Sequence, residues 1–322
     1  MSPILDVRNL QTHFFTKAGV LKAVDGVSFE IGAGEIIGLV GESGSGKSIT
    51  GFSILGLVDE PGRIVGGQIL FKGEDLTTLA PADMQKMRGS RIAMIFQDPM
   101  MTLNPVLRIE TQMIEAIQTH DSSVSKDEAR ERSRDTLGLV GISSPEERMR
   151  AYPHQFSGGM RQRVSIAIAM LNRPDLIIAD EPTTALDVTI QGQVIHEMQK
   201  LCRMTRTALL WITHDLAVVA GISNRICVMY AGRIVEQGPN EALIGNPMHP
   251  YTNGLLGSVP SQNRRGAPLQ QIEGIVPSLL NLPVGCAFEN RCSNALPECR
   301  QSAPDEVTLD DQRILRCFNK VK

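Results

Sequence analysis

The stretch Gly41-Glu42-Ser43-Gly44-Ser45-Gly46-Lys47-Ser48 decides the fold of this chain. It matches the phosphate-binding pattern G-x-x-x-x-G-K-[ST] at every fixed position. Glycines let successive backbone N–H groups turn toward phosphate oxygens, while Lys47 reaches the β- and γ-phosphates and the Ser48 hydroxyl ligates Mg²⁺. The apolar run Glu35–Val40 predicts a buried strand before the loop, and Ile49–Leu57 has the spacing of a helix after it. The stretch therefore predicts nucleotide phosphates bound at a helix N-terminus.

The overall composition is that of an ordinary globular protein. The chain has 322 residues, which is long enough for two domains. Of these residues, 42% are hydrophobic and 21% charged, as in globular proteins with buried cores. Its net charge of -3 gives no indication of nucleic acid or an anionic membrane as the main partner. The first residues lack a signal-peptide pattern, and no apolar run approaches the roughly 18 residues of a transmembrane helix. We therefore expect a cytoplasmic protein.

The remaining pattern alternates between strands and helices. Strands of an N-terminal sheet are predicted at Ile4–Phe14 and Leu21–Ile31, and a hairpin is predicted around Ala231-Gly232. Residues from Thr111 to about Leu139 have helical spacing, and another helix is expected from Ser157 to Leu171. Further short strands are predicted at Gln68–Lys72, Arg91–Phe96, Leu176–Asp180 and Ala208–Thr213, and a linker at Pro260–Pro268.

Two acids follow the predicted strand Leu176–Ala179. Asp180 fits the Mg²⁺ partner that a phosphate loop needs on a neighbouring strand (the Walker B acid). Glu181 comes directly after it, where a carboxylate at a strand tip could polarise an attacking water. Together with the loop Gly41–Ser48, these acids predict nucleotide hydrolysis.

A second glycine pair distinguishes this chain from kinases and GTP switches. Ser157-Gly158-Gly159 opens a predicted helix, so its backbone N–H groups and helix N-terminus are again offered to an anion. The two phosphate-seeking elements lie more than 100 residues apart in the sequence. This separation suggests one nucleotide held between two molecules.

At this point the chain resembles the ATP-binding cassette (ABC) ATPases over roughly residues 4 to 240. The family's ordered motifs occur here as Gly41–Ser48, Gln97, Ser157–Gly159, Leu176–Glu181, Ala185-Leu186-Asp187 and His214. The resemblance implies an α/β P-loop NTPase core of mixed sheet and helices, with an antiparallel β subdomain. It also implies a nucleotide-binding domain at 1–258 with a helical subdomain at about 98–172, followed by a small Cys-containing extension at 259–322.

The resemblance also assigns roles to single residues. Lys47, Gln97, Glu181 and His214 would be catalytic, with Glu181 as general base and His214 at the γ-phosphate. Mg²⁺ would be held by Ser48, Gln97 and Asp180, while Asp187 would connect the two sites of a head-to-tail dimer. ATP would be contacted by Phe14, Gly41, Ser43, Gly44, Ser45, Gly46, Lys47, Ser48 and Ile49, and across the dimer by Ser157, Gly158 and Gly159.

Two points of the family pattern stay open. The aromatic residue that stacks on adenine is predicted to be Phe14, with Phe15 as the competitor, and both could equally be core residues. The usual signature motif begins with Leu and ends in Gln, whereas Phe156 and Met160 take those places here. Because Ser157 and both glycines are kept, we expect a working signature.

Longer phrases resemble the dipeptide, oligopeptide and nickel importer branch, most closely the dipeptide importers. These phrases are Met94–Pro99, Leu103–Pro105, Asp180–Asp187 and His249–Thr252. The resemblance implies a peripheral subunit at the cytoplasmic face of the bacterial inner membrane that uses ATP to power di- or oligopeptide import. Its partners would be a second, non-identical ATPase, two membrane permease subunits and an external solute-binding protein, without nucleic acid.

Two alternatives are weighed against peptide import. A nickel or other small-solute importer of the same branch would carry the same motifs. A soluble ABC protein of DNA repair or translation is more remote, because the sequence has neither a long coiled-coil insertion nor a second cassette.

Four cysteines crowd into the last part of the chain. Cys286, Cys292, Cys299 and Cys317 are separated by five, six and seventeen residues, and in a reducing compartment they could supply four thiolates. The spacings of five and six are looser than in zinc knuckles. Because Gly285-Cys286 and Arg291-Cys292 resemble the importer branch, the resemblance implies a [4Fe–4S] cluster first, zinc second and free thiols third. The neighbouring Arg291, Arg300 and Arg316 would then ease the negative charge of the thiolates. Cys202 and Cys227, in apolar surroundings, are predicted to be core thiols.

Overall fold

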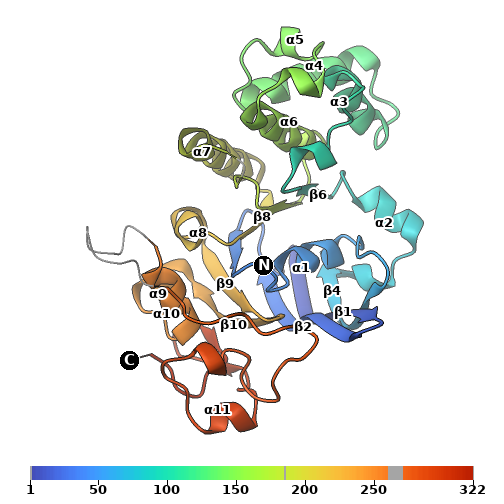
Figure 1. Ribbon diagram of the computed structural model, residues 1–322. Helices are drawn as coiled ribbons and strands as arrows, with labels where there is room; N and C mark the ends of the chain where they lie inside the picture. Colours follow the sequence, from blue (N-terminus) through green and yellow to red (C-terminus); the bar gives the residue numbers. More distant parts are fainter. Residues whose placement is uncertain (1, 185, 260–270, 322) are drawn as a thin grey trace. The chain divides into compact units, whose positions relative to one another are not determined.

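The computed structural model describes residues 2–184, 186–259 and 271–321, which fall into two compact units (Figure 1). Unit 1 consists of residues 1–4, 31–35 and 78–211. Unit 2 consists of residues 5–30, 36–77 and 212–322 and therefore contains both the phosphate-binding loop and the cysteine-rich end of the chain.

Unit 2 contains an antiparallel sheet built from the N-terminal strands. The strand order is β2-β1-β4-β5, and β1 pairs antiparallel with β4, with Val7 opposite Ile69. Leu5 and Val7 are buried and alternate with less buried residues, and Leu10 is buried after the register between β1 and β4 shifts beyond Arg8. The strands are β1 (Leu5–Thr16), β2 (Gly19–Ile31), β4 (Gly62–Phe71) and β5 (Glu74–Asp75).

A second group of strands in unit 2 carries the phosphate loop. Strand β3 pairs parallel with β9, β9 pairs antiparallel with β10, and the short C-terminal strands extend the series through β12 and β11. All five residues of β3 are buried, as expected for a strand covered on both faces. These strands are β3 (Ile36–Val40), β9 (Arg225–Tyr230), β10 (Arg233–Pro239), β11 (Val307–Thr308) and β12 (Ile314–Leu315). The helices of unit 2 are α1 (Lys47–Ile54), α8 (Leu216–Ile222), α9 (Asn240–Gly245), α10 (Pro250–Gly257) and α11 (Glu298–Gln301).

Unit 1 combines a small sheet with a group of helices. Its strands are β6 (Ile92–Ile95) and β7 (Leu176–Asp180), which pair parallel, and the first four residues of β8 (Ala208–Thr213). The helices α3, α4, α5 and α6 gather together in the green part of Figure 1. The helices of unit 1 are α2 (Pro81–Met87), α3 (Ile109–Gln118), α4 (Lys126–Leu139), α5 (Pro145–Arg148), α6 (Gly158–Met170) and α7 (Val188–Thr205).

The sequence predicts one helical run at Thr111–Leu139, but the structure has two helices there, so the prediction of a continuous helix was wrong. Helix α3 ends at Gln118, and the Asp121 carboxylate then accepts a hydrogen bond from the Ser123 backbone N–H at 3.1 Å. Ser125 caps the next helix, α4, by accepting from the Glu128 backbone N–H at 3.2 Å. Local side-chain hydrogen bonds to the backbone thus replace the helical ladder over this turn.

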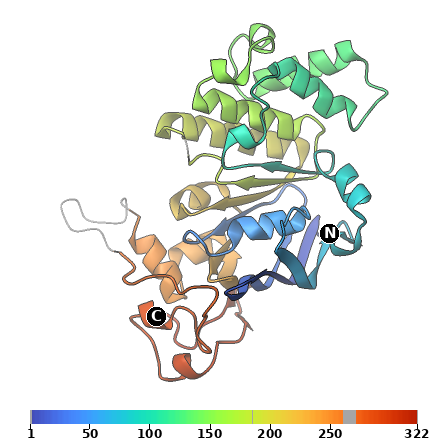
Figure 2. The same cartoon turned by 45° about the vertical axis from the view of Figure 1, so that its right-hand side comes forward.

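The C-terminal segment, residues 271–321, packs against the rest of unit 2 (Figure 2). Strand β12 pairs with β10, and the Val321 backbone N–H donates to the Met248 carbonyl at 2.8 Å. The predicted boundary between domains at 258 and 259 stays a prediction, and residues 260–270, with the predicted linker, lie outside the described residues. Among the described residues, no helix is long and apolar enough to cross a membrane.

Candidate nucleotide site

The phosphate-binding loop runs from the end of β3 into α1 and needs glycine at two points of close approach. Gly46 caps α1 with a left-handed backbone (φ 103°), and a Cβ there would lie 2.1 Å from the Ala23 carbonyl oxygen. A Cβ at Gly41 would lie 2.1 Å from the carbonyl oxygen of Met229 in β9. A Cβ at Gly44, in contrast, would meet no heavy atom within 4 Å. The loop is therefore held closely on its inner side and open at its outer bend, which fits a phosphate cradle.

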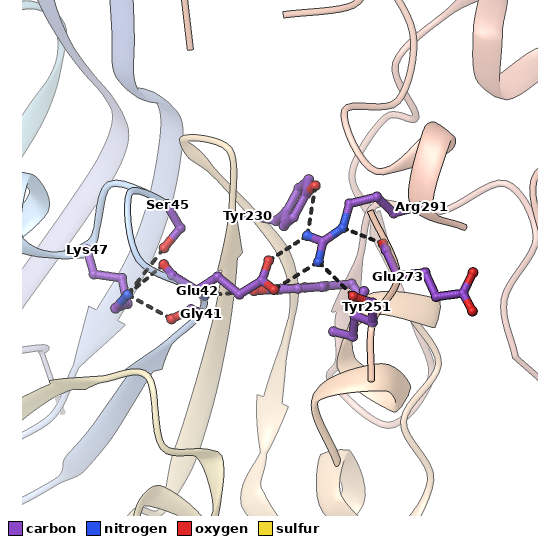
Figure 3. A network of polar contacts seen from close by, with 9 residues as sticks. Gly41, Glu42, Ser45, Lys47, Tyr230, Tyr251, Glu273 and Arg291 are labelled. Atoms are coloured by element: carbon purple, nitrogen blue, oxygen red, sulfur yellow. Dashed lines mark hydrogen bonds and ion pairs between the residues drawn. The ribbon is translucent and has the colours of Figure 1, made fainter. Parts of the chain in front are cut away.

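Lys47, the first residue of α1, is buried within the loop (Figure 3). Its Nζ donates to the carbonyl oxygens of Gly41 at 2.8 Å and Glu42 at 2.9 Å, and to Ser45 Oγ at 3.4 Å. The Ser45 carbonyl in turn accepts from the Gly232 N–H at 2.9 Å, at the β9–β10 turn. The ammonium group is thus placed at the centre of the loop, where phosphate oxygens are expected.

The two candidate adenine-stacking aromatics differ in their surroundings. Phe14 is half-buried, and its ring packs so closely on Gly62 that a Cβ there would lie 2.5 Å from the ring. Phe15 is 40% exposed, and the Arg63 guanidinium lies 4.4 Å from its ring centre. The assignment to Phe14 stays a prediction, and the exposure of the two rings favours Phe15.

The two acids of unit 1 lie at the tip of β7, as the sequence predicts. Asp180 ends the strand and is 4% exposed, while Glu181 follows with a left-handed backbone (φ 47°). The Glu181 Oε2 atom accepts from Thr184 Oγ1 at 2.5 Å. A buried non-glycine residue with positive φ stores backbone strain, which proteins concentrate at functional sites.

The signature and the Asp187 motif meet through one residue of α7. Ser157 caps α6, its Oγ accepting from the Met160 backbone N–H at 3.3 Å. Asp187 caps α7 in the same way, its Oδ1 accepting from the Ile190 N–H at 3.0 Å. A Cβ at Gly159 would lie 2.9 Å from Ile190 Cγ2, so the second glycine permits close packing of the two helices. Ala185 lies outside the described residues.

The other two predicted catalytic residues are exposed at strand ends. Gln97 follows β6, and His214 follows β8, directly before Asp215, which caps α8. Gln97, Asp180, Glu181, Asp187 and the signature belong to unit 1, whereas the loop Gly41–Ser48 and His214 belong to unit 2. Their gathering around one nucleotide stays a prediction.

The interpretation of the cysteine-rich segment as a cluster site was wrong. Among the described residues, which include all four cysteines, no group of three or more His, Cys, Asp and Glu side chains could hold a metal ion. This overturns both the [4Fe–4S] cluster and zinc at Cys286, Cys292, Cys299 and Cys317. Burial raises the pKa of Cys286 and Cys292, and that of Cys317 to about 11, so these thiols keep their protons at neutral pH.

The three arginines near the cysteines have carboxylate partners. Arg300 Nε lies 2.7 Å from a Glu289 oxygen, and Arg316 Nη2 lies 2.9 Å from a Glu306 oxygen. Arg291 pairs with Glu42 of the phosphate loop, 249 positions away in the sequence. The expectation that these arginines offset thiolate charge was wrong, because the described residues form no cluster of thiolates around a metal ion. The pairing of Arg291 with Glu42 was not anticipated, since Glu42 occupies a variable position of the loop pattern.

Strand, phosphate loop and helix, with a second capped glycine motif and buried strand-end acids, define a P-loop nucleotide hydrolase. Residues 24–184 match the ABC transporter family, and the chain belongs to it. Residues 235–299 match the C-terminal region of oligopeptide/dipeptide transporters. Family membership makes the protein an ATPase coupled to transport, as the sequence predicted.

Named relatives and solved structures agree with this assignment. The oligopeptide transport ATP-binding protein AppD of Bacillus subtilis is 49% identical over 99% of this chain and 97% of its own length. The oligopeptide transport ATP-binding protein OppD of Escherichia coli is 46% identical over 99% of this chain and 94% of its own. A dimeric ATP-binding cassette bound to ADP and Pi superposes with a TM-score of 0.67 at 25% identity, covering 73% of this chain and 98% of that one. The predicted P-loop NTPase fold of the ABC type is confirmed.

Proposed function

We propose that the protein is the ATP-hydrolysing subunit of an importer of di- or oligopeptides. The match of residues 235–299 to the C-terminal region of oligopeptide/dipeptide transporters carries this proposal. Relatives named for oligopeptide and dipeptide transport, at 49% and 46% identity, support it over nearly the whole chain. The competing hypothesis is an importer of nickel or another small solute.

The residues of the site divide the work of hydrolysis. The loop Gly41–Ser48 binds the phosphates of ATP, with Lys47 as the fixed positive charge. Ser48, Gln97 and Asp180 would hold Mg²⁺, which when bound offsets charge on the phosphate oxygens. Glu181 takes the proton of the attacking water, and His214 supports the γ-phosphate.

ATP is bound between two ATPase subunits in this proposal. Ser157, Gly158 and Gly159 contact the ATP on the partner's phosphate loop, and Asp187 connects the two sites. Two solved structures of one ATP-binding cassette that resembles this chain are dimeric, which supports the arrangement. The partners would be a second, non-identical ATPase, two membrane permeases and an external solute-binding protein, at the cytoplasmic face of the membrane.

Glu181→Gln tests the general base in the assembled transporter. Turnover should nearly vanish while ATP binding persists, because the amide cannot take the proton from water. Glu241→Gln, at an exposed acid of α9, is the matched control and should hydrolyse ATP normally. Unchanged turnover in Glu181→Gln would disprove the base assignment. Peptide uptake by the reconstituted transporter, measured beside nickel uptake, tests the substrate class.

A further inference from the structure

The C-terminal segment contacts the phosphate-binding loop through an ion pair between the buried Arg291 and the half-buried Glu42. Arg291 Nη1 lies 2.6 Å from Glu42 Oε2, and Arg291 Nη2 lies 2.9 Å from Glu42 Oε1 (Figure 3). The Arg291 side chain is only 4% exposed. This two-pronged geometry is the strong form of an arginine–carboxylate pair and fixes orientation as well as charge.

Arg291 makes three further hydrogen bonds besides those to Glu42. Besides its two bonds to Glu42, its Nη1 donates to the Tyr230 hydroxyl at 3.3 Å, Nε to the Glu273 carbonyl at 2.9 Å, and Nη2 to the Ile272 carbonyl at 3.3 Å. These contacts use all five N–H donors of a guanidinium group. The bond to Glu42 raises the pKa of Arg291, so the guanidinium keeps its charge although it is buried.

Glu42 makes hydrogen bonds through its carboxylate, its backbone N–H and its carbonyl, and the last of these joins it to Lys47 of the loop. Its carboxylate meets Arg291, its backbone N–H donates to the Tyr251 hydroxyl at 2.8 Å, and its carbonyl accepts from Lys47 Nζ at 2.9 Å. One residue thus separates Arg291 from the ammonium group at the centre of the loop.

An aromatic cluster keeps Arg291 in place. Phe288, three residues before Arg291, is 3% exposed, and its ring centre lies 5.2 Å from that of Tyr230 and 5.3 Å from that of Tyr251. The guanidinium carbon lies 5.8 Å from the ring centres of Tyr230 and Phe288. The cluster joins the C-terminal segment to β9 and α10, so the position of Arg291 is determined by packing.

We propose that Arg291 is a positioning residue for ATP binding, through which the C-terminal segment holds the phosphate-binding loop in its binding conformation. Arg291 orients Glu42, and Glu42 sets the loop backbone around Lys47. Arg291 also neutralises a carboxylate that would otherwise repel the phosphates of ATP from within their own binding loop. The affinity for nucleotide therefore depends on a residue outside the motifs of the ABC family match, which ends at residue 184.

The experiment measures binding of fluorescent N-methylanthraniloyl-ADP with Mg²⁺ to the full chain. We expect Arg291→Ala to raise the Kd about tenfold, the size expected when a hydrogen-bonded charge partner is lost. Arg291→Lys should recover part of the lost affinity, because lysine keeps the positive charge but cannot form both parallel hydrogen bonds to the carboxylate. The double variant Glu42→Gln/Arg291→Ala should bind no worse than Arg291→Ala, since both act through one contact. Arg300→Ala, which breaks the exposed Arg300–Glu289 pair of the same segment, should leave the Kd unchanged.

Each result supports the proposal or overturns it. An unchanged Kd in Arg291→Ala overturns the proposal, with or without a lower melting temperature. A double variant whose Kd rises clearly above that of Arg291→Ala also overturns it. An equal loss in Arg300→Ala would show a general effect of the segment and also overturns it. If Arg291→Ala does not fold, the Kd of Glu42→Gln replaces it as the test. In Glu42→Gln, Arg291 keeps its hydrogen bonds to Tyr230, Ile272 and Glu273, so the fold should be retained. A higher Kd in Glu42→Gln supports the proposal, and an unchanged or lower Kd rejects it.

Discussion

Phe288 packs edge-on against Tyr230, with ring centres 5.2 Å apart and ring planes at 85°. Phe288 belongs to the C-terminal segment and Tyr230 ends β9, so this pair joins the last part of the chain to the sheet beside the phosphate loop. Edge-to-face pairs of this kind contribute beyond the area that they bury. Phe288 of the C-terminal segment is thus part of the core of unit 2.

Phe288→Ala should lower the free energy of unfolding by about 3–5 kcal/mol, because it leaves a cavity among Tyr230, Tyr251 and His249. Phe288→Leu fills more of that space and should cost less. Urea denaturation of the full chain measures both. A loss below about 1 kcal/mol in Phe288→Ala would mean that the segment is not packed as described.

The two glycines of the signature should respond differently to alanine. A Cβ added at Gly158 would meet no heavy atom within 4 Å, whereas a Cβ added at Gly159 would meet Ile190 Cγ2 at 2.9 Å. Gly158→Ala should therefore be neutral or stabilise α6 by up to about 1 kcal/mol, and Gly159→Ala should destabilise by about 1–3 kcal/mol through overpacking. Denaturation of the isolated chain measures the free energy of unfolding of both variants. Equal effects would contradict the close packing of α6 and α7.

Asp187 has a structural role that can be separated from its predicted catalytic role. Its carboxylate caps α7 through the Ile190 N–H, and asparagine caps a helix equally well. Asp187→Ala should cost about 1 kcal/mol of stability, and Asp187→Asn should keep it. If Asp187 also connects the two ATP sites, Asp187→Asn should still reduce ATP turnover in the assembled transporter. Normal turnover in Asp187→Asn would leave only the capping role.

The parts of the site that a local pattern specifies were predictable. The loop Gly41–Ser48 and the strand Leu176–Asp180 follow from residue types at fixed spacing, because glycine torsions and strand burial are local requirements. The break after Gln118 was missed, since it depends on two side-chain hydrogen bonds to the backbone.

Long-range pairing could not be derived from spacing. The partner of Arg291 lies 249 positions away, and no local pattern indicates it. The four cysteines are close enough in sequence to predict a metal site, but their side chains do not form a ligand group in the described structure. Sequence spacing limits which residues can meet, whereas packing decides which do.

The buried His249 should make stability depend on pH. Its Nδ1 accepts from the Tyr251 backbone N–H at 3.0 Å, and burial lowers the pKa of His249 to about 3. In the unfolded chain the histidine pKa is about 6.5, so between pH 6.5 and 3 the unfolded state binds the extra proton. Above pH 6.5 both states are neutral, and stability does not change through this residue. As pH falls below 6.5, the free energy of unfolding should drop by about 1.4 kcal/mol per pH unit from His249 alone.

His249→Asn isolates this contribution, because an asparagine oxygen can accept the same N–H without titrating. Urea denaturation at pH 7.0, 6.0 and 5.0 should show the wild type losing stability faster than His249→Asn, so that their difference shifts in favour of the variant at low pH. His196→Asn, at an exposed histidine of α7, is the matched control and should follow the wild type. Parallel pH profiles for the wild type and His249→Asn would show that His249 is not held neutral by burial.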